Sequence, residues 1–180
     1  KSRPEGYLTG QLLIAMPQMR DPRFTRTVIY MCAHSSTGAM GLVVNRRVGS
    51  LTFTELLKQL NIGPNRRSEE IRVHFGGPVE SGRGFVLHSA DYVQNNTMLV
   101  SDNVALTATI DILRDLAAGG GPKRSILALG YAGWGAGQLD AEVQAHGWLS
   151  APADDAIVFD AVLEQKWERA IGKLGVEQSY

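Results

Sequence analysis

The sequence has a single cysteine, Cys32, among its 180 residues, so no disulfide can form within the chain. A lone cysteine suits a protein kept in a reducing compartment. Long apolar runs are also missing, since no stretch reaches the roughly 20 residues that a membrane-spanning helix needs. The apolar block at 12–16 is too short and too interrupted for a good signal peptide. We therefore expect a cytoplasmic protein with no membrane association.

Net charge is also absent, because 18 basic residues balance 18 acidic ones. The distribution is uneven: residues 1–90 hold twelve basic and six acidic residues, and residues 91–180 hold the reverse. The simplest interpretation is that the two halves pack together and their fields largely cancel. The alternative is a basic face that meets a phosphate-bearing partner. Its members would be Arg20, Arg23, Arg26, Arg46, Arg47, Arg66 and Arg67.

Motifs for metal binding and catalysis are missing from the local sequence. None of the four histidines stands three or four residues from another histidine or from the cysteine, so no metal site is predicted. There is no G-x-S-x-G elbow and no P-loop, and we expect no cofactor. Cys32 and His34 stand two apart on a predicted strand, so their side chains should share a face and could form a thiolate–imidazolium pair. Apolar neighbours favour simple packing for Cys32.

Strands and helices alternate along the chain, and several strands look paired as hairpins. The hydrophobic pattern predicts strands at 8–15, 27–34, 41–45, 72–75, 84–88, 98–101, 104–108 and 126–129. It predicts helices around Leu56–Leu60, capped by Thr52 or Thr54, at 109–118 and at 138–145, and a last helix that follows 152–155 and has apolar residues at helical spacing from Phe159 to Leu174. This order favours an α+β fold with a mixed sheet over a parallel α/β sheet. We expect one domain over residues 1–180.

The segment Gly130–Asp140 is the most informative part of the chain. It follows a buried apolar run and precedes a helix, which predicts a strand, a glycine-rich turn over 130–137 and a helix. Glycines permit positive φ and close approach of a ligand, and a helix amino terminus favours anions. Gly76-Gly77-Pro78 is a second turn signal. The simpler interpretation of both segments is a requirement of the backbone.

The two glycine-rich segments could also converge on one pocket. Polar and aromatic side chains near the predicted strand ends would then form its walls around a small molecule. This hypothesis gives a ligand-binding set of Asn45, Gly76, Gly77, His88, Gly133 and Trp134.

Five sequence blocks carry a resemblance to known proteins. They are 10–17 (GQLLIAMP), His34 with 38–45 (GAMGLVVN), 75–79 (FGGPV) with 87–88, 130–134 (GYAGW) with 137–139, and 148–149 with 153–154. Together they resemble the YqgE/AlgH family of bacterial proteins. Their order and spacing cover nearly the whole chain. The departures are Ala33 where the family often has Glu, Arg47 where Pro is common, Asp140 for Glu and His146 for Asn. Asp140 keeps the carboxylate but shortens its reach.

The resemblance implies an α+β fold in which a branched, mixed β-sheet includes a small barrel and is surrounded by helices. It implies no settled activity: the family has been called a transcriptional regulator, yet it lacks a recognisable DNA-binding module and has no agreed catalytic residues. We therefore expect a non-enzymatic regulatory protein that binds a small molecule or another protein. The alternative is a regulator contacting nucleic acid through Arg46, Arg47, Arg66 and Arg67, and an enzyme of unrecognised type using Cys32 and His34 is less favoured.

Overall fold

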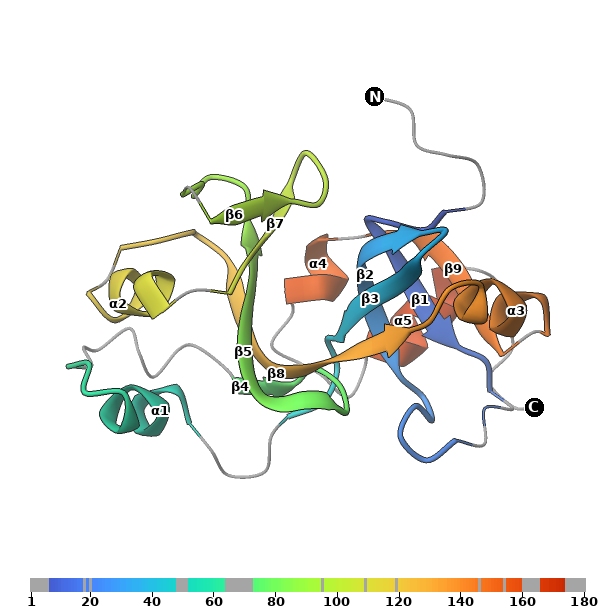
Figure 1. Cartoon of the computed structure of the whole chain (residues 1–180), viewed down its shortest axis with the longest axis horizontal. Helices are drawn as coiled ribbons and strands as arrows, with labels where there is room; N and C mark the ends of the chain where they lie inside the picture. Colours follow the sequence, from blue (N-terminus) through green and yellow to red (C-terminus); the bar gives the residue numbers. More distant parts are fainter. Residues whose placement is uncertain are drawn as a thin grey trace.

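The computed structural model describes residues 7–17, 19, 21–47, 52–63, 73–94, 96–108, 110–118, 120–145, 147–153, 155–159 and 166–173. The strands are β1 (Gln11–Ala15), β2 (Val28–Ser35), β3 (Gly38–Val43), β4 (Val73–Phe75), β5 (Val79–Ser89), β6 (Thr97–Leu99), β7 (Val104–Thr107), β8 (Ser125–Trp134) and β9 (Trp148–Pro152). The helices are α1 (Phe53–Gln59), α2 (Ile110–Ala117), α3 (Gln138–Gln144), α4 (Asp155–Phe159) and α5 (Lys166–Lys173). Figure 1 shows their arrangement.

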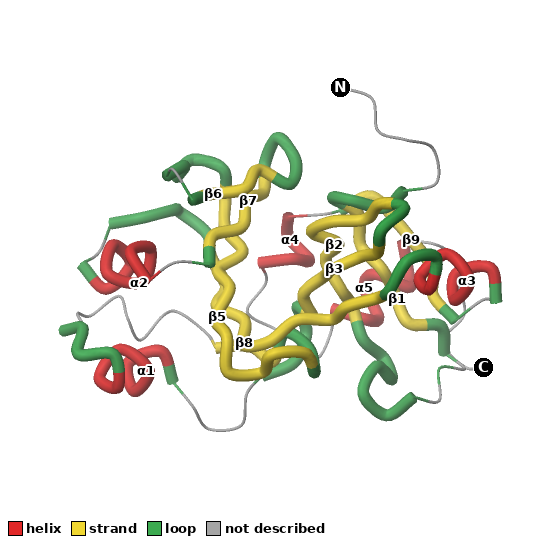
Figure 2. Tube along the Cα trace, viewed as in Figure 1, coloured by secondary structure: helices red, strands yellow, loops and turns green. Residues whose placement is uncertain are grey.

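These strands form one curled sheet in the order β6-β7-β5-β8-β3-β2-β1-β9, with β4 joined to β8 as a branch. The β4–β8 pair is parallel and the other pairs are antiparallel, so the sheet is mixed. The predicted α+β class and branched sheet are confirmed, and the barrel is a half-barrel. We call β1, β2, β3, β9 and Ala132–Trp134 the β2 half, and β4, β5, β6, β7 and Ser125–Leu129 the β5 half (Figure 2).

Strand β8 runs through both halves, and this corrects the prediction of a turn over 130–137. Leu129 pairs with β4 and β5, whereas Ala132 already pairs with Gly41 of β3. Gly130 lies between them with φ of 78°, a conformation that bends the strand and that residues with a Cβ disfavour. The glycine marks a bend inside a strand, which has the same sequence signature as a turn.

Gly76 and Gly77 lie in the link between β4 and β5, where the chain crosses over β8. Strand β4 pairs with one edge of β8, and β5 pairs with the other. The link between them passes so close that a Cβ on Gly76 would lie 2.3 Å from the carbonyl oxygen of Gly130. A Cβ on Gly77 would lie 2.1 Å from the carbonyl carbon of Tyr131. Both glycines therefore meet a steric requirement of the branch, where the sequence indicated a tight turn.

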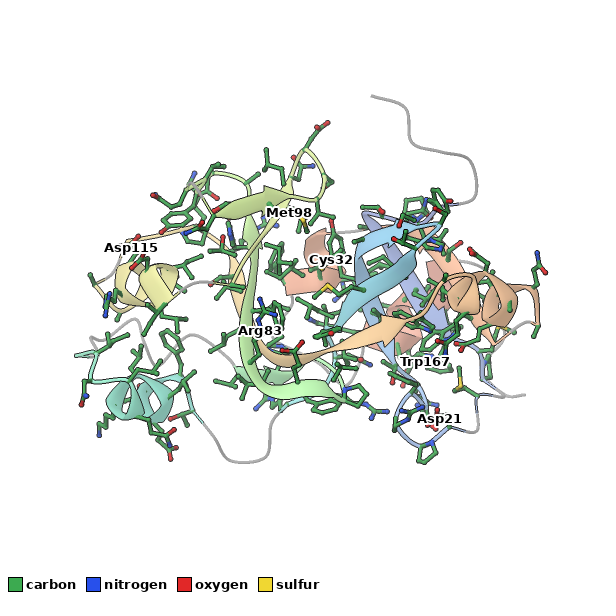
Figure 3. All side chains as sticks on the ribbon, in the orientation of Figure 1. Asp21, Cys32, Arg83, Met98, Asp115 and Trp167 are labelled. Carbon is green, nitrogen blue, oxygen red and sulfur yellow. The ribbon has the colours of Figure 1, made fainter. Side chains whose placement is uncertain are left out.

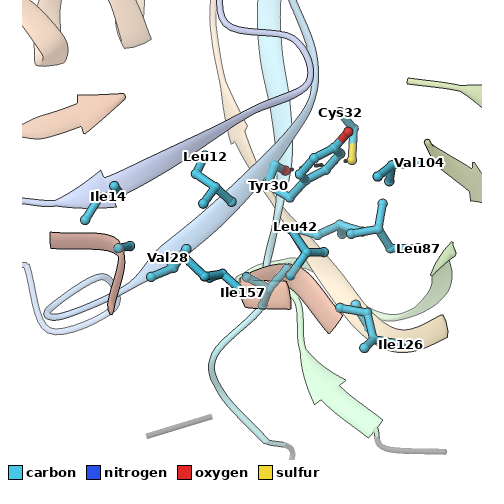
Figure 4. Packing of buried hydrophobic residues seen from close by; sticks show 14 of the residues in the cluster. Leu12, Ile14, Val28, Tyr30, Cys32, Leu42, Leu87, Val104, Ile126 and Ile157 are labelled. Carbon is cyan, nitrogen blue, oxygen red and sulfur yellow. Dashed lines mark hydrogen bonds between the residues drawn. The ribbon is translucent and has the colours of Figure 1, made fainter. Parts of the chain in front are cut away.

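Three apolar clusters fill the space around the sheet. The central cluster includes Tyr30, Cys32, Leu42, Leu87 and Val104, which Figure 4 shows packed together between the two halves. A second cluster lies under α3, and a third lies under α1 and α2. No helix in the described part of the chain is long and apolar enough to cross a membrane.

Local signals explain the two helices of the β5 half. The hydroxyl of Thr52 accepts a hydrogen bond from the backbone N–H of Glu55 at 3.1 Å, so Thr52 is the N-cap of α1. Helix α2 forms where it was predicted and buries Ile112, Leu113, Leu116 and Ala117. Ile110, expected on the buried stripe, is 38% exposed because it begins the helix at the edge of that stripe.

Candidate functional site

A pocket of about 320 Å³ lies beside α3, and we call it the α3 pocket. Its volume is within the range of small-molecule sites, roughly 300–1,000 Å³. It is enclosed by the loop before β2, the start of β5, the end of β8, one face of α3 and the start of β9. The lining residues are Met19, Asp21, Arg23, Phe24, Pro78, Val79, Gly133, Trp134, Gln138, Glu142, Ala145, Gly147 and Trp148.

Glu142 fixes the aromatic floor of this pocket. Its Oε1 accepts hydrogen bonds from the indole N–H of Trp134 at 3.1 Å and from that of Trp148 at 3.0 Å. Its Oε2 accepts one from the amide of Gln138 at 3.1 Å, one helical turn earlier. The two indoles meet edge to face with centroids 6.2 Å apart, and both are largely buried. Phe24 stands edge-on to Trp148 at 5.6 Å.

Two further charged groups lie at the rim. The guanidinium of Arg23 binds both carboxylate oxygens of Asp21, at 3.1 and 2.8 Å, and this contact lowers the pKa of Asp21. The same guanidinium lies 5.2 Å above the ring of Phe24. Figure 3 shows Asp21 on the loop beside the β2 half. The pocket thus combines a buried aromatic floor with a polar, charged rim.

The structure brings together only part of the predicted ligand-binding set. Gly133 and Trp134 line the α3 pocket, as do Pro78 and Val79, which directly follow Gly76 and Gly77. The two glycine-rich segments therefore meet at one pocket. Gly76 and Gly77 themselves pack against β8 and do not line it.

Asn45 and His88 lie elsewhere and have their own partners. The amide of Asn45 accepts a hydrogen bond from the N–H of Val28 at 3.0 Å and donates one to the carbonyl of Arg26 at 2.9 Å. These bonds hold the first residue of β2 and the loop before it. The ring of His88 is fully buried in the β5 half. It hydrogen-bonds the Ser89 carbonyl at 2.9 Å and the Thr107 hydroxyl at 2.8 Å. Burial lowers the pKa of this histidine.

Cys32 and His34 do not share a face, so the prediction of a shared face is wrong, and Cys32 packs among apolar side chains as the simpler interpretation has it. A β-bulge lies between Met31, which pairs with Gly41, and Ala33, which pairs with Met40. The extra residue breaks the alternation of side chains. Cys32 joins the central cluster, whereas His34 contacts α3 on the opposite face. Burial raises the pKa of the Cys32 thiol to about 12, which disfavours the thiolate that nucleophilic chemistry needs.

His34 connects three segments that are distant in sequence. Its Nδ1 accepts the backbone N–H of Leu8 at 3.0 Å, so the ring proton is assigned to Nε2. Nε2 then donates to Asp140 of α3 at 3.0 Å, which shows that the shorter carboxylate at 140 still reaches a partner. Tyr7 stands edge-on to the ring at 5.0 Å. Both ring nitrogens are occupied, and the interactions indicate a structural role.

The predicted basic face is partly neutralised. Arg23 pairs with Asp21, and Arg26 pairs with Glu168 at 3.3 Å while covering the ring of Trp167. Arg46 donates to the carbonyls of Arg23 and Thr25 at 2.9 and 2.6 Å. Arg47 is exposed beside β4. Arg20, Arg66 and Arg67 lie outside the described residues.

Lys166 is a buried group that sequence reasoning missed. Its ammonium donates to the carbonyls of Val44 and Val158 at 2.7 Å each, and its side chain is fully buried. A lysine at the start of an amphipathic helix gives no sequence signal of burial, because such positions are normally exposed. Within the described ranges, His, Cys, Asp and Glu side chains form no cluster of three that could hold a metal ion.

Comparison with known proteins gives consistent matches along the whole chain. The profile of the AlgH-like family, DUF179, matches residues 12–179. A UPF0301 protein of Rhodospirillum rubrum is 54% identical over 96% of this chain and 90% of its own length. One from Rhodopseudomonas palustris strain HaA2 is 56% identical over 95% of this chain and 82% of its own.

Two solved structures share the fold. The solution structure of the AlgH protein from Pseudomonas aeruginosa superposes with a TM-score of 0.83 at 44% identity, covering 99% of this chain and 95% of that one. A crystal structure of a protein from Corynebacterium diphtheriae gives a TM-score of 0.73 at 20% identity, with 96% and 90% coverage, and supports the fold alone. The names of these proteins state no activity.

Proposed function

This chain belongs to the AlgH-like family, and we propose that it is a non-enzymatic binding protein that holds a small molecule in the α3 pocket. The observation that carries the proposal is the aromatic floor of that pocket. Glu142 braces Trp134 and Trp148 at a fixed angle beneath a cavity of about 320 Å³. A preformed cavity with an apolar floor and a few polar groups is typical of ligand sites.

The surroundings of the pocket support binding over catalysis. The buried Cys32 is separated from His34 by the bulge, and the two ring nitrogens of His34 are already occupied. The pocket is instead built from five parts of the chain that a ligand could join: the loop before β2, the start of β5, the end of β8, helix α3 and the start of β9. We assign the protein to the cytoplasm, where a free buried cysteine stays reduced.

Nucleic acid is the less favoured partner, because Arg23 and Arg26 are paired with acidic side chains and Arg46 is held by backbone carbonyls. An electrostatic contact with nucleic acid would weaken steeply with salt, with a log–log slope of roughly −0.9 per phosphate neutralised. Binding of a short duplex that follows such a slope, and that Arg47→Ala reduces, would favour the regulatory alternative.

The pocket is tested with N-phenyl-1-naphthylamine, a neutral probe that fluoresces in apolar sites. We expect saturable binding to the wild type. Val79→Trp should weaken it at least about tenfold, because Val79 lines the pocket and is 36% exposed, so a larger side chain there fills the cavity without disturbing the core.

Val93→Trp is the matched control, since Val93 is 53% exposed and lies outside the pocket. This variant should bind the probe as the wild type does. The proposal fails if Val79→Trp binds like the wild type, or if the wild type shows no saturable binding.

A further inference from the structure

We infer that the ligand of the α3 pocket carries a positively charged nitrogen and that Glu142 is its counter-ion, an inference that rests on the proposed function. Glu142 accepts three hydrogen bonds, and all three come from neutral N–H groups of Trp134, Trp148 and Gln138. Among the described residues no basic side chain forms an ion pair with it. Its negative charge is thus fixed in place beside a cavity, near the Arg23 guanidinium but in no ion pair with it.

Bracing two indoles does not require this charge. An indole N–H needs only an acceptor oxygen, which a neutral amide at position 142 would also offer. The carboxylate carries in addition a negative charge, and this half-buried group lines the cavity beside the aromatic rings. The charge is therefore available for a task other than holding the floor.

The other charges of the described lining cancel. Asp21 and Arg23 form a two-point ion pair with oxygen–nitrogen distances of 3.1 and 2.8 Å. Among the described residues that line the pocket, the charged ones are these two and Glu142, so this part of the lining carries one net negative charge. That net charge would repel an anion and attract a cation.

The aromatic walls also favour a cation. Faces of Trp and Phe rings are negative and attract ammonium and guanidinium groups. Arg23 places its guanidinium 5.2 Å from the ring centroid of Phe24, so a cation of the protein itself already contacts one aromatic wall of this pocket. An alkylammonium group with an apolar body matches both the carboxylate and the rings.

The test compares choline with 3,3-dimethylbutan-1-ol, which has the same shape but a carbon in place of the charged nitrogen. Binding is followed by tryptophan fluorescence in a Trp167→Phe background, because Trp167 packs in the central cluster while Trp134 and Trp148 form the pocket floor. We expect choline to bind at least about tenfold more tightly than the alcohol. Equal affinity overturns the inference.

Glu142→Gln keeps an acceptor for the indoles and removes the charge. It should reduce choline binding to the level of the alcohol and leave alcohol binding unchanged. Asp111→Asn is the control, because Asp111 is an exposed carboxylate on α2, far from the pocket lining. Choline that binds Glu142→Gln as it binds the wild type overturns the inference.

Arg23→Gln is the alternative variant if Glu142→Gln does not fold. Arg23 is exposed, so the variant should fold, and the loss of its positive charge makes the pocket more negative. Choline should then bind more tightly, and unchanged or weaker binding overturns the inference. Binding of N-phenyl-1-naphthylamine distinguishes failure of the proposed ligand site from failure of the proposed ligand charge. If Val79→Trp still weakens binding of this probe and Val93→Trp does not, while choline and the alcohol bind equally, the α3 pocket remains a ligand site and the inference of a cationic ligand is wrong.

Discussion

The two halves of the sheet are stabilised in different ways. In the β2 half, buried polar side chains join distant segments: Lys166 reaches Val44, and His34 joins Leu8 to Asp140. In the β5 half, helices α1 and α2 cover an apolar cluster, and the buried ring of His88 bonds Thr107 of the neighbouring strand. The edge of this half leaves Val93, Met98 and Leu99 between 44% and 57% exposed. The comparison teaches that buried polar contacts of the β2 half join segments far apart in the sequence, whereas that of His88 with Thr107 joins two neighbouring strands.

The largest expected effect is at the junction of the halves. Gly77→Ala should lower the free energy of unfolding by about 4 kcal/mol or more, because φ is 153° and the new Cβ would lie 2.1 Å from the backbone of Tyr131. Urea unfolding measures the change. Gly82→Ala is the control, since a Cβ there meets nothing within 4 Å. An unchanged midpoint for Gly77→Ala would show that the crossing can relax.

A smaller loss is expected in the β2 half from Lys166→Met. The methionine fills similar space but leaves the carbonyls of Val44 and Val158 without the ammonium donor, at a cost of about 3 kcal/mol. Thermal and urea unfolding measure it. Lys58→Met, on the exposed face of α1 in the β5 half, should change stability by less than about 0.5 kcal/mol. Equal effects of the two substitutions would show that the buried ammonium of Lys166 contributes no more to stability than the exposed ammonium of Lys58.

The smallest effect is a pH dependence in the β5 half. Burial lowers the pKa of folded His88 below the value of about 6.5 in the unfolded chain. Above pH 6.5 the His88 ring is neutral in both the folded and the unfolded chain. As the pH falls below 6.5, the unfolded state gains a proton that the folded state resists, so stability decreases until the folded pKa is reached.

His88→Gln removes this titration. The difference in stability between wild type and variant should therefore shift with pH by at most about 1.4 kcal/mol per unit below pH 6.5 and stay constant above it. Unfolding by urea at several pH values measures it. A difference that is the same at pH 5 and pH 8 would show that His88 contributes no linkage.

Most elements could be predicted from the sequence, because they depend on local patterns. The β2–β3 hairpin, the Thr52 cap and helix α2 follow from alternation, capping chemistry and helical spacing. Features that depend on distant partners could not be predicted. Gly130 looks the same in sequence whether it turns the chain or bends a strand. The pairing of the rest of β8 with β3, β4 and β5 shows that the glycine bends a strand.

The candidate site was predictable only at its glycine-rich borders. Gly133 and Trp134 were identified because aromatic and glycine residues stand together at the end of an apolar run. Glu142, Phe24 and Trp148 are not in the predicted set, since each lies on a different part of the chain and no local pattern joins them, although 148–149 is one of the blocks of the family resemblance. The bulge at Cys32 also has no sequence signal, because one inserted residue changes the side of the sheet on which the following side chains lie without changing the composition.

The long sequence separation between β3 and its partner strand β8 also matters while the chain is being synthesised. The β2–β3 hairpin pairs neighbouring residues, but β3 pairs on its other side with Ala132–Trp134, far later in the sequence. Until that part has been synthesised, Ala39–Gly41 has no partner strand on this side, and an open strand edge is able to pair with another chain. Synthesis of β8 therefore supplies the partner of β3, and synthesis of β9 later supplies that of β1.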